Sequence, residues 1–256
     1  MQNAFSVNSF VDKVYVLSVK SFKDRIHHVK KEMGKHHIQF EFVFDYDVPE
    51  LKPTLLKKHF ARSNNLTPAQ KSLILKHRFA WQDALKHEYQ RVLIFEDDVI
   101  LLPHFNQNFR ALISTIEKLP KDFLIFFGGG DTKVPDHFFL EEGLLVRHPI
   151  ATAEAYLVDL ANVRRRMAWL DKHPITLPAD HLIKHIDCDL YGAQHYWVKK
   201  PLVEQGSVTG LFVSKLDSHR LKHSIYFNIL RHRWNKFHRR TLKSLIVKFK
   251  FFLLGP

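Results

Sequence analysis

A short apolar run that passes directly into three carboxylates is the feature that most restricts how this chain can fold. Val92-Leu93-Ile94-Phe95 has the length of a buried strand, and Glu96-Asp97-Asp98 follows it without a break. An unpaired buried carboxylate is costly, so three of them at a strand end require a cation, hydrogen-bond donors or water. Ligands bind at the carboxyl ends of strands in α/β proteins, and Mg²⁺ and Mn²⁺ prefer oxygen ligands. The motif alone is consistent with a metal–diphosphate site, with a solvated acidic turn, or with an acidic cap on the next helix.

Strand-like and helix-like segments alternate on both sides of this motif. Further strands are expected at residues 13–19, 38–44, 123–127, 153–158, 197–198 and 202–203. Helices are expected at residues 24–33, 105–118 and 160–171 and from Pro178 onward, while residues 45–66 are expected to be irregular. A long helix should begin at Pro68 with Thr67 as its N-cap, and Gly34 is a stop signal for the helix at 24–33. The alternation predicts an α/β domain with a mostly parallel central sheet.

The composition is typical of a protein with one large domain in a reducing compartment. Of the 256 residues, 45% are hydrophobic, which is enough to bury a sizeable core. The single cysteine, Cys188, excludes an intramolecular disulfide. No apolar run reaches the roughly 20 residues that span a bilayer, and the first residues lack the basic start and apolar core of a signal peptide. We therefore expect a cytoplasmic protein.

Positive charge is concentrated near the C-terminus. Residues 219–256 contain ten Lys or Arg and no Asp or Glu, so they carry ten of the thirteen net positive charges and leave three for residues 1–218. We expect a domain at 1–218 and a basic amphipathic helical tail at 219–256. A largely apolar stripe at helical steps runs along the tail: Leu230, Trp234, Phe237, Thr241 and Leu245. Such a helix suits an anionic membrane surface, and the alternative is a helix packed on the domain.

Four segments carry a family resemblance. They are Val14-Tyr15-Val16-Leu17-Ser18 with Arg25; Leu66-Thr67-Pro68-Ala69 with His77 and Trp81; Phe95-Glu96-Asp97-Asp98-Val99; and Ala155-Tyr156-Leu157 with Pro178-Ala179-Asp180-His181-Leu182. In this order and spacing they resemble glycosyltransferase family 25, the lipooligosaccharide and lipopolysaccharide glycosyltransferases. The chain departs from the family pattern at Ser18 (usually asparagine), Ala69 (often glycine) and Ala153-Glu154 (commonly Gly-Thr). Covering about residues 12–210, the resemblance implies a GT-A type fold, a nucleotide-sugar-binding α/β domain with a divalent cation on its acidic motif.

The resemblance also implies an activity. It points to an inverting hexosyltransferase that moves galactose or glucose from a UDP-sugar to a lipooligosaccharide or lipopolysaccharide core acceptor, with Mn²⁺ or Mg²⁺ as cofactor. Asp98 and Glu96 are the expected metal ligands, because side chains two residues apart on an extended chain point to the same side. Asp97 would then point to the other side of the strand. We expect it either to have a structural role or to contact the nucleotide sugar.

Other segments supply the remaining expected site residues. The nucleotide-sugar site is expected to include Leu17, Ser18, Arg25, His77, Asp97, Gly129 and Asp131. Structural alternatives stand beside them: Arg25 as a solvated cation at a helix start, His77 as a satisfied core residue, and the glycines at 128–130 as a plain turn. An inverting reaction needs a general base, and the candidates are Asp180 first, Glu154 second, then Asp187 and Asp189. A carboxylate in a first helical turn, such as Asp180, is also favoured by the helix dipole alone.

Two other functions fit parts of the sequence. The acidic motif could serve a metal-dependent phosphoesterase, although few further acids are placed like a two-metal site. A pI near 9.7 and a basic tail would suit a nucleic-acid-binding protein, but no helix-turn-helix or zinc pattern is present. We expect instead a protein at the inner face of the bacterial inner membrane, peripherally bound. Its expected partners are the UDP-sugar, a lipid-linked oligosaccharide acceptor and, through the tail, an anionic membrane surface, with no nucleic acid.

Overall fold

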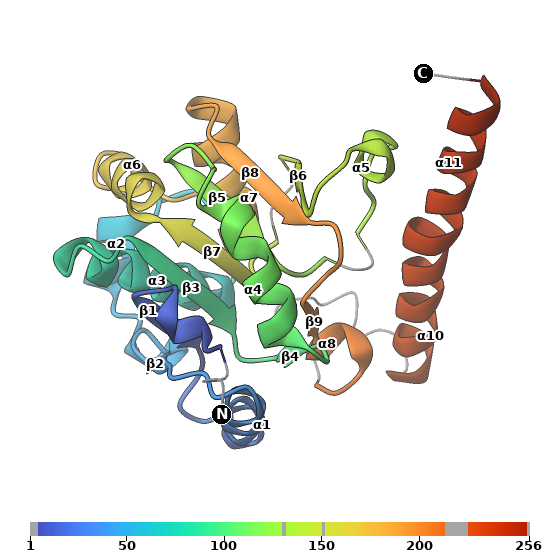
Figure 1. Ribbon diagram of the computed structural model, residues 1–256. Coiled ribbons are helices and arrows are strands. Elements are labelled where there is room, and N and C mark those ends of the chain that lie inside the picture. Colours follow the sequence, from blue (N-terminus) through green and yellow to red (C-terminus); the bar gives the residue numbers. More distant parts are fainter. Residues whose placement is uncertain (1–4, 130–131, 150–151, 213–224, 255–256) are drawn as a thin grey trace.

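A seven-stranded sheet with helices on both faces forms the larger part of the protein (Figure 1). The computed structural model describes residues 5–129, 132–149, 152–212 and 225–254. The strand order is β2-β1-β3-β7-β5-β8-β6, with bounds Glu41–Val43, Lys13–Leu17, Arg91–Glu96, Ala155–Asp159, Phe123–Phe126, Gln194–Val198 and Leu145–Arg147. Within this sheet β7 and β6 run against the direction shared by the other strands. The predicted α/β fold with a mostly parallel sheet is confirmed.

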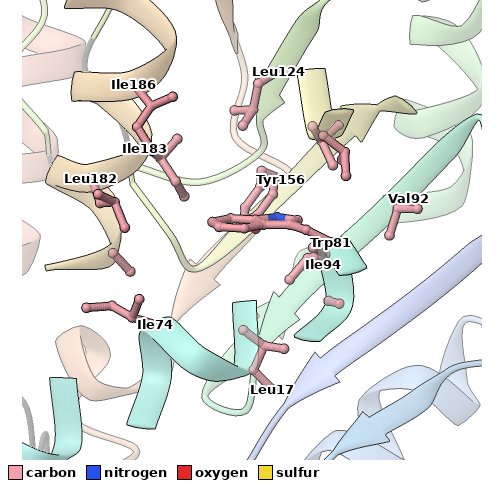
Figure 2. Close-up of a cluster of buried hydrophobic side chains, with 14 of the residues drawn as sticks. Leu17, Ile74, Trp81, Val92, Ile94, Leu124, Tyr156, Leu182, Ile183 and Ile186 are labelled. Atoms are coloured by element: carbon pink, nitrogen blue, oxygen red, sulfur yellow. The ribbon is translucent and has the colours of Figure 1, made fainter. Parts of the chain in front are cut away.

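Alternating side chains along the central strands build a separate core on each face of the sheet. On β3, Val92 and Ile94 enter one cluster, whereas Leu93 and Phe95 enter the other. The first cluster packs against α3 (Pro68–Lys86), α6 (Leu160–Leu170) and α7 (Ala179–Lys184), and Figure 2 shows Trp81 of α3 among its members. The second packs against α1 (Lys23–Lys35) and α4 (Phe105–Ile116). Both faces of the sheet are therefore buried, as the continuous apolar run of β3 requires.

The start of α3 follows the predicted capping chemistry. The Thr67 side chain accepts a hydrogen bond from the Gln70 N–H at 3.2 Å, while the Gln70 side chain accepts one from the Thr67 N–H at 2.9 Å. Two otherwise unpaired donors are thereby satisfied, and Pro68 occupies the first turn, where its missing N–H costs nothing. The cap fixes which residues of α3 face the carboxyl ends of the strands.

Several element boundaries differ from the prediction. Helix α1 passes through Gly34 and ends at Lys35, so the glycine is not its stop. The segment expected to be irregular contains a 3₁₀ turn (Val48–Glu50) and α2 (Pro53–His59). Pro49 and Pro53 lie in the first turns of these two elements, where proline starts a helix instead of breaking it. Strands β4 and β6 and the short helix α5 (His137–Leu140) were not predicted, because three or four residues carry too little periodicity.

A small second sheet brings a late part of the chain to the end of β3. It consists of β4 (Val99–Leu101) and β9 (Val203–Gln205), and the short helix α8 (Gly206–Thr209) follows. The Gly206 N–H donates to the Asp98 carbonyl at 2.6 Å, and a Cβ on Gly206 would lie 2.8 Å from that oxygen. Glycine at position 206 therefore permits an approach that any side chain would obstruct.

The C-terminal residues form a helix beside the rest of the protein, here called the tail helix: α10 (Ile225–Lys236), a π-helical turn (Phe237–Leu242) and α11 (Lys243–Leu254). Figure 1 shows it running past α8 and α5. His232 and Val247 are buried on its docked face, whereas Trp234 and Phe249 remain more than half exposed on another. Among the described residues, no helix has the length and apolar composition needed to cross a bilayer.

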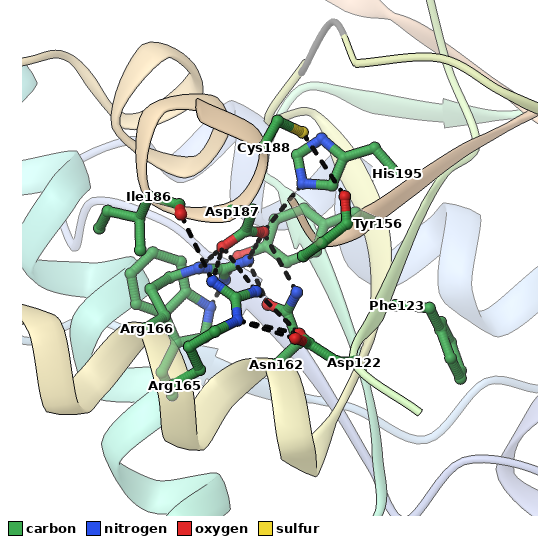
Figure 3. Close-up of polar contacts among 12 residues, drawn as sticks. Asp122, Phe123, Tyr156, Asn162, Arg165, Arg166, Ile186, Asp187, Cys188 and His195 are labelled. Atoms are coloured by element: carbon green, nitrogen blue, oxygen red, sulfur yellow. Dashed lines mark hydrogen bonds and ion pairs between the residues drawn. The ribbon is translucent and has the colours of Figure 1, made fainter. Parts of the chain in front are cut away.

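A buried ion-pair network ties α6 to the segment after α7 (Figure 3). The Asp187 carboxylate accepts hydrogen bonds from Arg166 at 2.5 Å, His195 at 2.9 Å and Arg165 at 3.2 Å, and it is fully buried. Burial opposes its charge, but Arg166 and His195 outweigh burial and hold the pKa of Asp187 below its ordinary value. Asp187 is therefore a structural ion, and its candidacy as general base is wrong. Asp189, also a candidate, lies on the surface paired with Lys184 at 2.6 Å.

Replacing Asp187 by asparagine should destabilise the protein strongly. Asp187→Asn leaves the buried Arg166 guanidinium without its counter-ion, so we expect the free energy of unfolding to fall by about 3–5 kcal/mol. The matched change Asp189→Asn removes only an exposed pair and should cost less than about 1 kcal/mol. Urea denaturation of both variants measures the difference. Because the pKa of Asp187 is depressed in the folded protein, its contribution to the free energy of unfolding is present above the unfolded-state pKa and is lost as the pH falls. Equal losses of stability in the two variants would refute the structural role of Asp187.

Candidate functional site

A cavity of about 310 Å³ opens where β1 and β3 end side by side. The two strands are parallel, and Leu17 is paired in register with Glu96, so the residues that follow them converge. The cavity is lined by Leu17, Ser18, Val19, Ser21, Phe22, Arg25, Val48, Pro49, Ala69, Ser72, Leu73, Lys76, Glu96, Asp97, Asp98, Gln205 and Ser207. Of the predicted site residues, Leu17, Ser18, Arg25, Glu96, Asp97 and Asp98 are thus brought to one place.

Asp98 has one carboxylate oxygen satisfied and one not. The Ser207 N–H donates to Asp98 Oδ2 at 3.2 Å, whereas the buried Oδ1 has no hydrogen-bond partner among the described residues. The side chain is 3% exposed, so solvent cannot readily supply the missing partner. Such a carboxylate oxygen is a typical ligand of a divalent cation.

The other acids crowd around Glu96. Burial first, and then the charges of Asp98, Glu154, Asp97 and Asp180, raise the pKa of Glu96 well above its ordinary value. These carboxylates come from the end of β3, the turn after it, the residue that precedes β7 and the first turn of α7. Among the described residues, no three carboxylate, imidazole or thiolate groups could hold a metal ion by themselves. A cation here would need one or two carboxylates and further ligands from a bound phosphate or water, which is how Mg²⁺ is usually held.

Asp97 faces the same cavity as its neighbours. Residues 97–98 form a turn between β3 and β4, so the expected extended geometry with Asp97 pointing away is wrong. Asp97 accepts hydrogen bonds from the Ser18 hydroxyl at 2.8 Å and from Arg25 Nη1 at 2.6 Å. The Arg25 guanidinium also lies over the rings of Phe22 and Phe212, 5.3 and 5.2 Å from their centroids. Asp97 therefore orients Ser18 and Arg25 at the cavity wall.

Lys76 lines the cavity and was not among the predicted site residues. It is 2% exposed, and its ammonium group donates to the Asp45 carbonyl at 2.7 Å and to Asp47 Oδ1 at 2.8 Å. Burial lowers its pKa, and Asp47 opposes that effect. Ala69, Ser72 and Lys76 recur at helical steps on α3 and all line the cavity. That spacing of small and polar residues on one side of a helix is the signal that could have revealed them.

Glu154 and the glycines after β5 pack directly on one another. The Gly129 N–H donates to Glu154 Oε1 at 2.7 Å, and a Cβ on Gly128 would lie 2.1 Å from that oxygen. Burial raises the pKa of Glu154, and the charge of Asp98 is one of the smaller contributions in the same direction. Gly129 itself has φ +73°, with Trp197 where its side chain would be. The two glycines thus hold Glu154 beside the acidic cluster. Asp131, another predicted site residue, lies outside the described residues.

His77 lies in the core and does not line the cavity. Its Nδ1 is 2.9 Å from the Tyr156 hydroxyl, which also accepts a hydrogen bond from Trp81 Nε1 at 3.0 Å. Burial, with a contribution from the Arg166 charge, lowers the pKa of His77 to about 3, so the ring is neutral at physiological pH. The expectation of direct contact with the nucleotide sugar is not met by this geometry. His77 thus has the core position named as the alternative, although its buried Nε2 has no hydrogen-bond partner among the described residues.

Comparison with known proteins identifies relatives of this chain. Residues 11–140, just over half of it, match the profile of the family described as "Glycosyltransferase family 25 (LPS biosynthesis protein)". "Lipooligosaccharide biosynthesis protein lic2B" of Haemophilus influenzae is 34% identical over 90 residues, 34% of each chain. "Inactive glycosyltransferase 25 family member 3" of Mus musculus is 25% identical over 187 residues, 67% of this chain and 31% of the relative. The matched segments thus span about a third of these relatives' lengths.

One solved structure can be set beside these relatives. The crystal structure of "a glycosyltransferase involved in the glycosylation of the major capsid of PBCV-1" covers 86% of this chain and 99% of its own, at 12% identity and a TM-score of 0.41.

Substituting Gly128 tests whether the two glycines hold the Glu154 carboxylate in place. In Gly128→Ala the new methyl group must displace the Glu154 carboxylate and break its bond to the Gly129 N–H, so the free energy of unfolding should fall by about 1–3 kcal/mol. Gly34→Ala is the matched control, because nothing lies within 4 Å of its added Cβ and alanine favours the helix by about 0.5–1 kcal/mol. Thermal unfolding of both variants decides: a Gly128→Ala protein as stable as the wild type would mean that Glu154 is not held in this way.

Proposed function

Because this chain belongs to glycosyltransferase family 25, we propose that it is an inverting hexosyltransferase of lipooligosaccharide or lipopolysaccharide synthesis. In this proposal it has a GT-A type fold and transfers galactose or glucose from a UDP-sugar to a core saccharide acceptor. The observation that carries the proposal is the buried, unpartnered Asp98 oxygen in a cluster of carboxylates at the strand ends. The name of the Haemophilus relative, a lipooligosaccharide biosynthesis protein, supports the choice of acceptor.

The cavity has the chemistry that a nucleoside diphosphate requires. Arg25 lies in its wall between two aromatic rings, and its guanidinium can donate to phosphate oxygens while Asp97 holds it in place. Lys76 adds a second, buried positive charge on the α3 side. Ser18 and the apolar residues Leu17, Val48 and Leu73 leave room for a flat base against one side of the cavity.

Asp98 and Glu96 are the proposed ligands of Mn²⁺ or Mg²⁺. The unpartnered Oδ1 and the mutual repulsion of these carboxylates fit a cation, which relieves both. When bound, such an ion neutralises the charge that develops on a departing diphosphate. Asp97 keeps Arg25 in the wall of the same cavity, so the chain itself supplies a further positive charge for the diphosphate.

The general base is proposed among the carboxylates next to this cluster. Asp180 is half-buried in the first turn of α7, near enough to Glu96 for its charge to raise the pKa of that residue. An ionised carboxylate at this place can accept the proton of an acceptor hydroxyl as the oxygen attacks the sugar. Glu154 is the second candidate. Each candidate has one oxygen bound by a backbone N–H, from His181 to Asp180 and from Gly129 to Glu154, but Glu154 is buried and burial raises its pKa. We therefore assign the role to Asp180.

The tail helix is proposed to lie on an anionic membrane surface. The predicted stripe faces away from the rest of the protein: Leu230 is 70%, Trp234 62% and Leu245 62% exposed. Phe249 and Phe252 extend the stripe, and Lys and Arg residues flank it. Exposed apolar side chains together with flanking cations match the requirements for peripheral binding at the inner face of a bacterial inner membrane.

Isothermal titration calorimetry with UDP tests the nucleotide site. With Mn²⁺ present, UDP should bind the wild type, and Asp98→Asn should weaken this binding by at least about tenfold, since a charged ligand oxygen is lost. Asp12→Asn is the matched control, because Asp12 lies at the opposite end of the sheet, where it accepts from the Arg91 N–H.

Other results would lead away from this proposal. No UDP binding with or without Mn²⁺ would remove UDP-sugars as donors. Mn²⁺ binding combined with cleavage of a simple phosphate ester, and no requirement for a sugar acceptor, would favour the phosphoesterase. An Asp98→Asn protein that binds UDP and Mn²⁺ as the wild type does would move the metal site elsewhere.

Sedimentation with lipid vesicles tests the tail helix. Trp234→Ser/Phe249→Ser should reduce binding to vesicles containing phosphatidylglycerol by at least about tenfold, because two aromatic side chains no longer enter the interface. Leu190→Ser/Tyr191→Ser removes two apolar side chains that are 48% and 52% exposed outside the tail helix and serves as control. If both pairs of substitutions weaken binding equally, the tail helix is not the membrane-binding element.

A further inference from the structure

A second cavity, of about 570 Å³, lies where the tail helix meets the segment between β5 and α5. It is lined by Lys133, Val134, Pro135, His148, His238, Arg239, Leu242, Lys243 and Ile246. Figure 1 shows α11 passing α5 here, with β6 on the other side of α5. This cavity shares no lining residue with the one at the end of β3.

The lining of this cavity is positive and, among the residues that the structure describes, includes no carboxylate. Lys133, Arg239 and Lys243 are cationic, and two imidazoles accompany them. Lys243 reaches the Val134 carbonyl at 2.6 Å and Asp136 at 2.8 Å, which fixes its ammonium group at the rim. Asp136 stands outside the lining and pairs with Lys243, so Lys133 and Arg239 supply the rest of the positive charge. The cavity therefore attracts an anion.

His148 provides an independent sign of a missing polar ligand. The residue is 5% exposed, and its Nε2 is buried without a hydrogen-bond partner among the described residues. The rings of Phe138 and Trp197 hold the imidazole in position, with centroids 6.5 and 5.8 Å away. Buried polar atoms are normally paired, so a group that completes this nitrogen is expected in the cavity.

The remaining lining is apolar and reaches the surface. Val134, Pro135, Leu242 and Ile246 complete the cavity, and Ile246 is 46% exposed next to Leu245 of the apolar stripe. A small inorganic anion would leave these side chains without a partner. A molecule with a phosphate group beside a hydrocarbon part would satisfy the cations, His148 and the apolar wall together.

The same turn of the tail helix also contacts the glycines beside the acidic cluster. Arg240 Nη2 donates to the Gly129 carbonyl at 2.6 Å, and the Gly129 N–H is the group that binds Glu154. The Arg240 guanidinium stacks on Phe138, 4.8 Å from the ring centroid. The Gly129 peptide group therefore connects the turn of the tail helix next to the cavity with Glu154, the second candidate for the general base.

We propose that the cavity between the tail helix and Lys133–Pro135 binds the phosphate headgroup of the lipid that carries the acceptor saccharide. The inference rests on the proposed function for the identity of the occupant. It explains why cations, an unpartnered imidazole and an apolar wall occur together at the edge of the exposed stripe. The cavity would hold the lipid end of the acceptor while its sugar extends toward Asp180.

Histidine-ring NMR of the full chain tests the cavity directly. The His148 signal is assigned by its loss in His148→Gln, and the protein is titrated with dioctanoyl phosphatidic acid, dioctanoyl phosphatidylcholine and inorganic phosphate. We expect phosphatidic acid to shift the His148 signal at a concentration at least about tenfold lower than inorganic phosphate does, and phosphatidylcholine to have no effect. Lys133→Ala should weaken phosphatidic acid binding about fivefold, whereas Lys86→Ala, an exposed lysine at the far end of α3, should not.

Each contrary result overturns the proposal. An unshifted His148, or equal losses in Lys133→Ala and Lys86→Ala, would mean that the cavity is not the binding site. Inorganic phosphate as effective as phosphatidic acid would indicate a free-anion site, and a single-stranded oligonucleotide that binds more tightly would indicate nucleic acid. UDP binding to the wild type is measured in parallel: its absence would reject the proposed function, while the NMR result still decides whether the cavity binds a lipid phosphate.

Discussion

Repulsion among the carboxylates at the end of β3 is the constraint around which the rest of the structure is arranged. The parallel pairing of Leu17 with Glu96 brings the residues after β1 against those after β3. Ser18 and Arg25 bind the Asp97 carboxylate, and the Ser207 N–H binds the Asp98 carboxylate. Each of these partners neutralises or solvates part of the charge, yet one Asp98 oxygen and the Glu96 carboxylate remain under strong repulsion. Such residual repulsion is costly in an apoprotein and is common where a cation binds.

The sequence was most informative where a pattern has one physical solution. The apolar run 92–95 has the length of a strand buried on both faces, and Thr67-Pro68 is a strong helix-start signal; the structure has both. The direction of β7 could not be predicted, since a buried strand has the same apolar pattern whichever way it runs. Gly34 was misleading because an open position on a helix tolerates glycine without ending there.

The site was predictable to the extent that its residues adjoin a strand end. Asp98, Asp97, Glu96, Ser18 and Arg25 follow β1 or β3 closely, and the cavity unites them. Lys76 was missed because a lysine in a helix usually points to water, and its burial depends on Asp47 from a distant turn. Asp187 was considered as a general base because its partners could not be recognised from the sequence. They are Arg165 and Arg166 of α6 and His195 of β8, and no local pattern indicates that they meet Asp187.

The π-helical turn at Phe237–Leu242 has a consequence for how the tail helix can change. A π turn accommodates one more residue than an α turn, so it resets the angular phase of everything that follows it. Arg240 lies inside that turn and meets Gly129, while Lys243 and Val247 just beyond it still face the same neighbours. Deleting one residue there would restore a regular α-helix but rotate α11 by roughly a quarter turn or more relative to α10. The spacing of residues in this turn is therefore under tighter restriction than their chemical identity, and relatives should tolerate substitution in it more readily than a change of length.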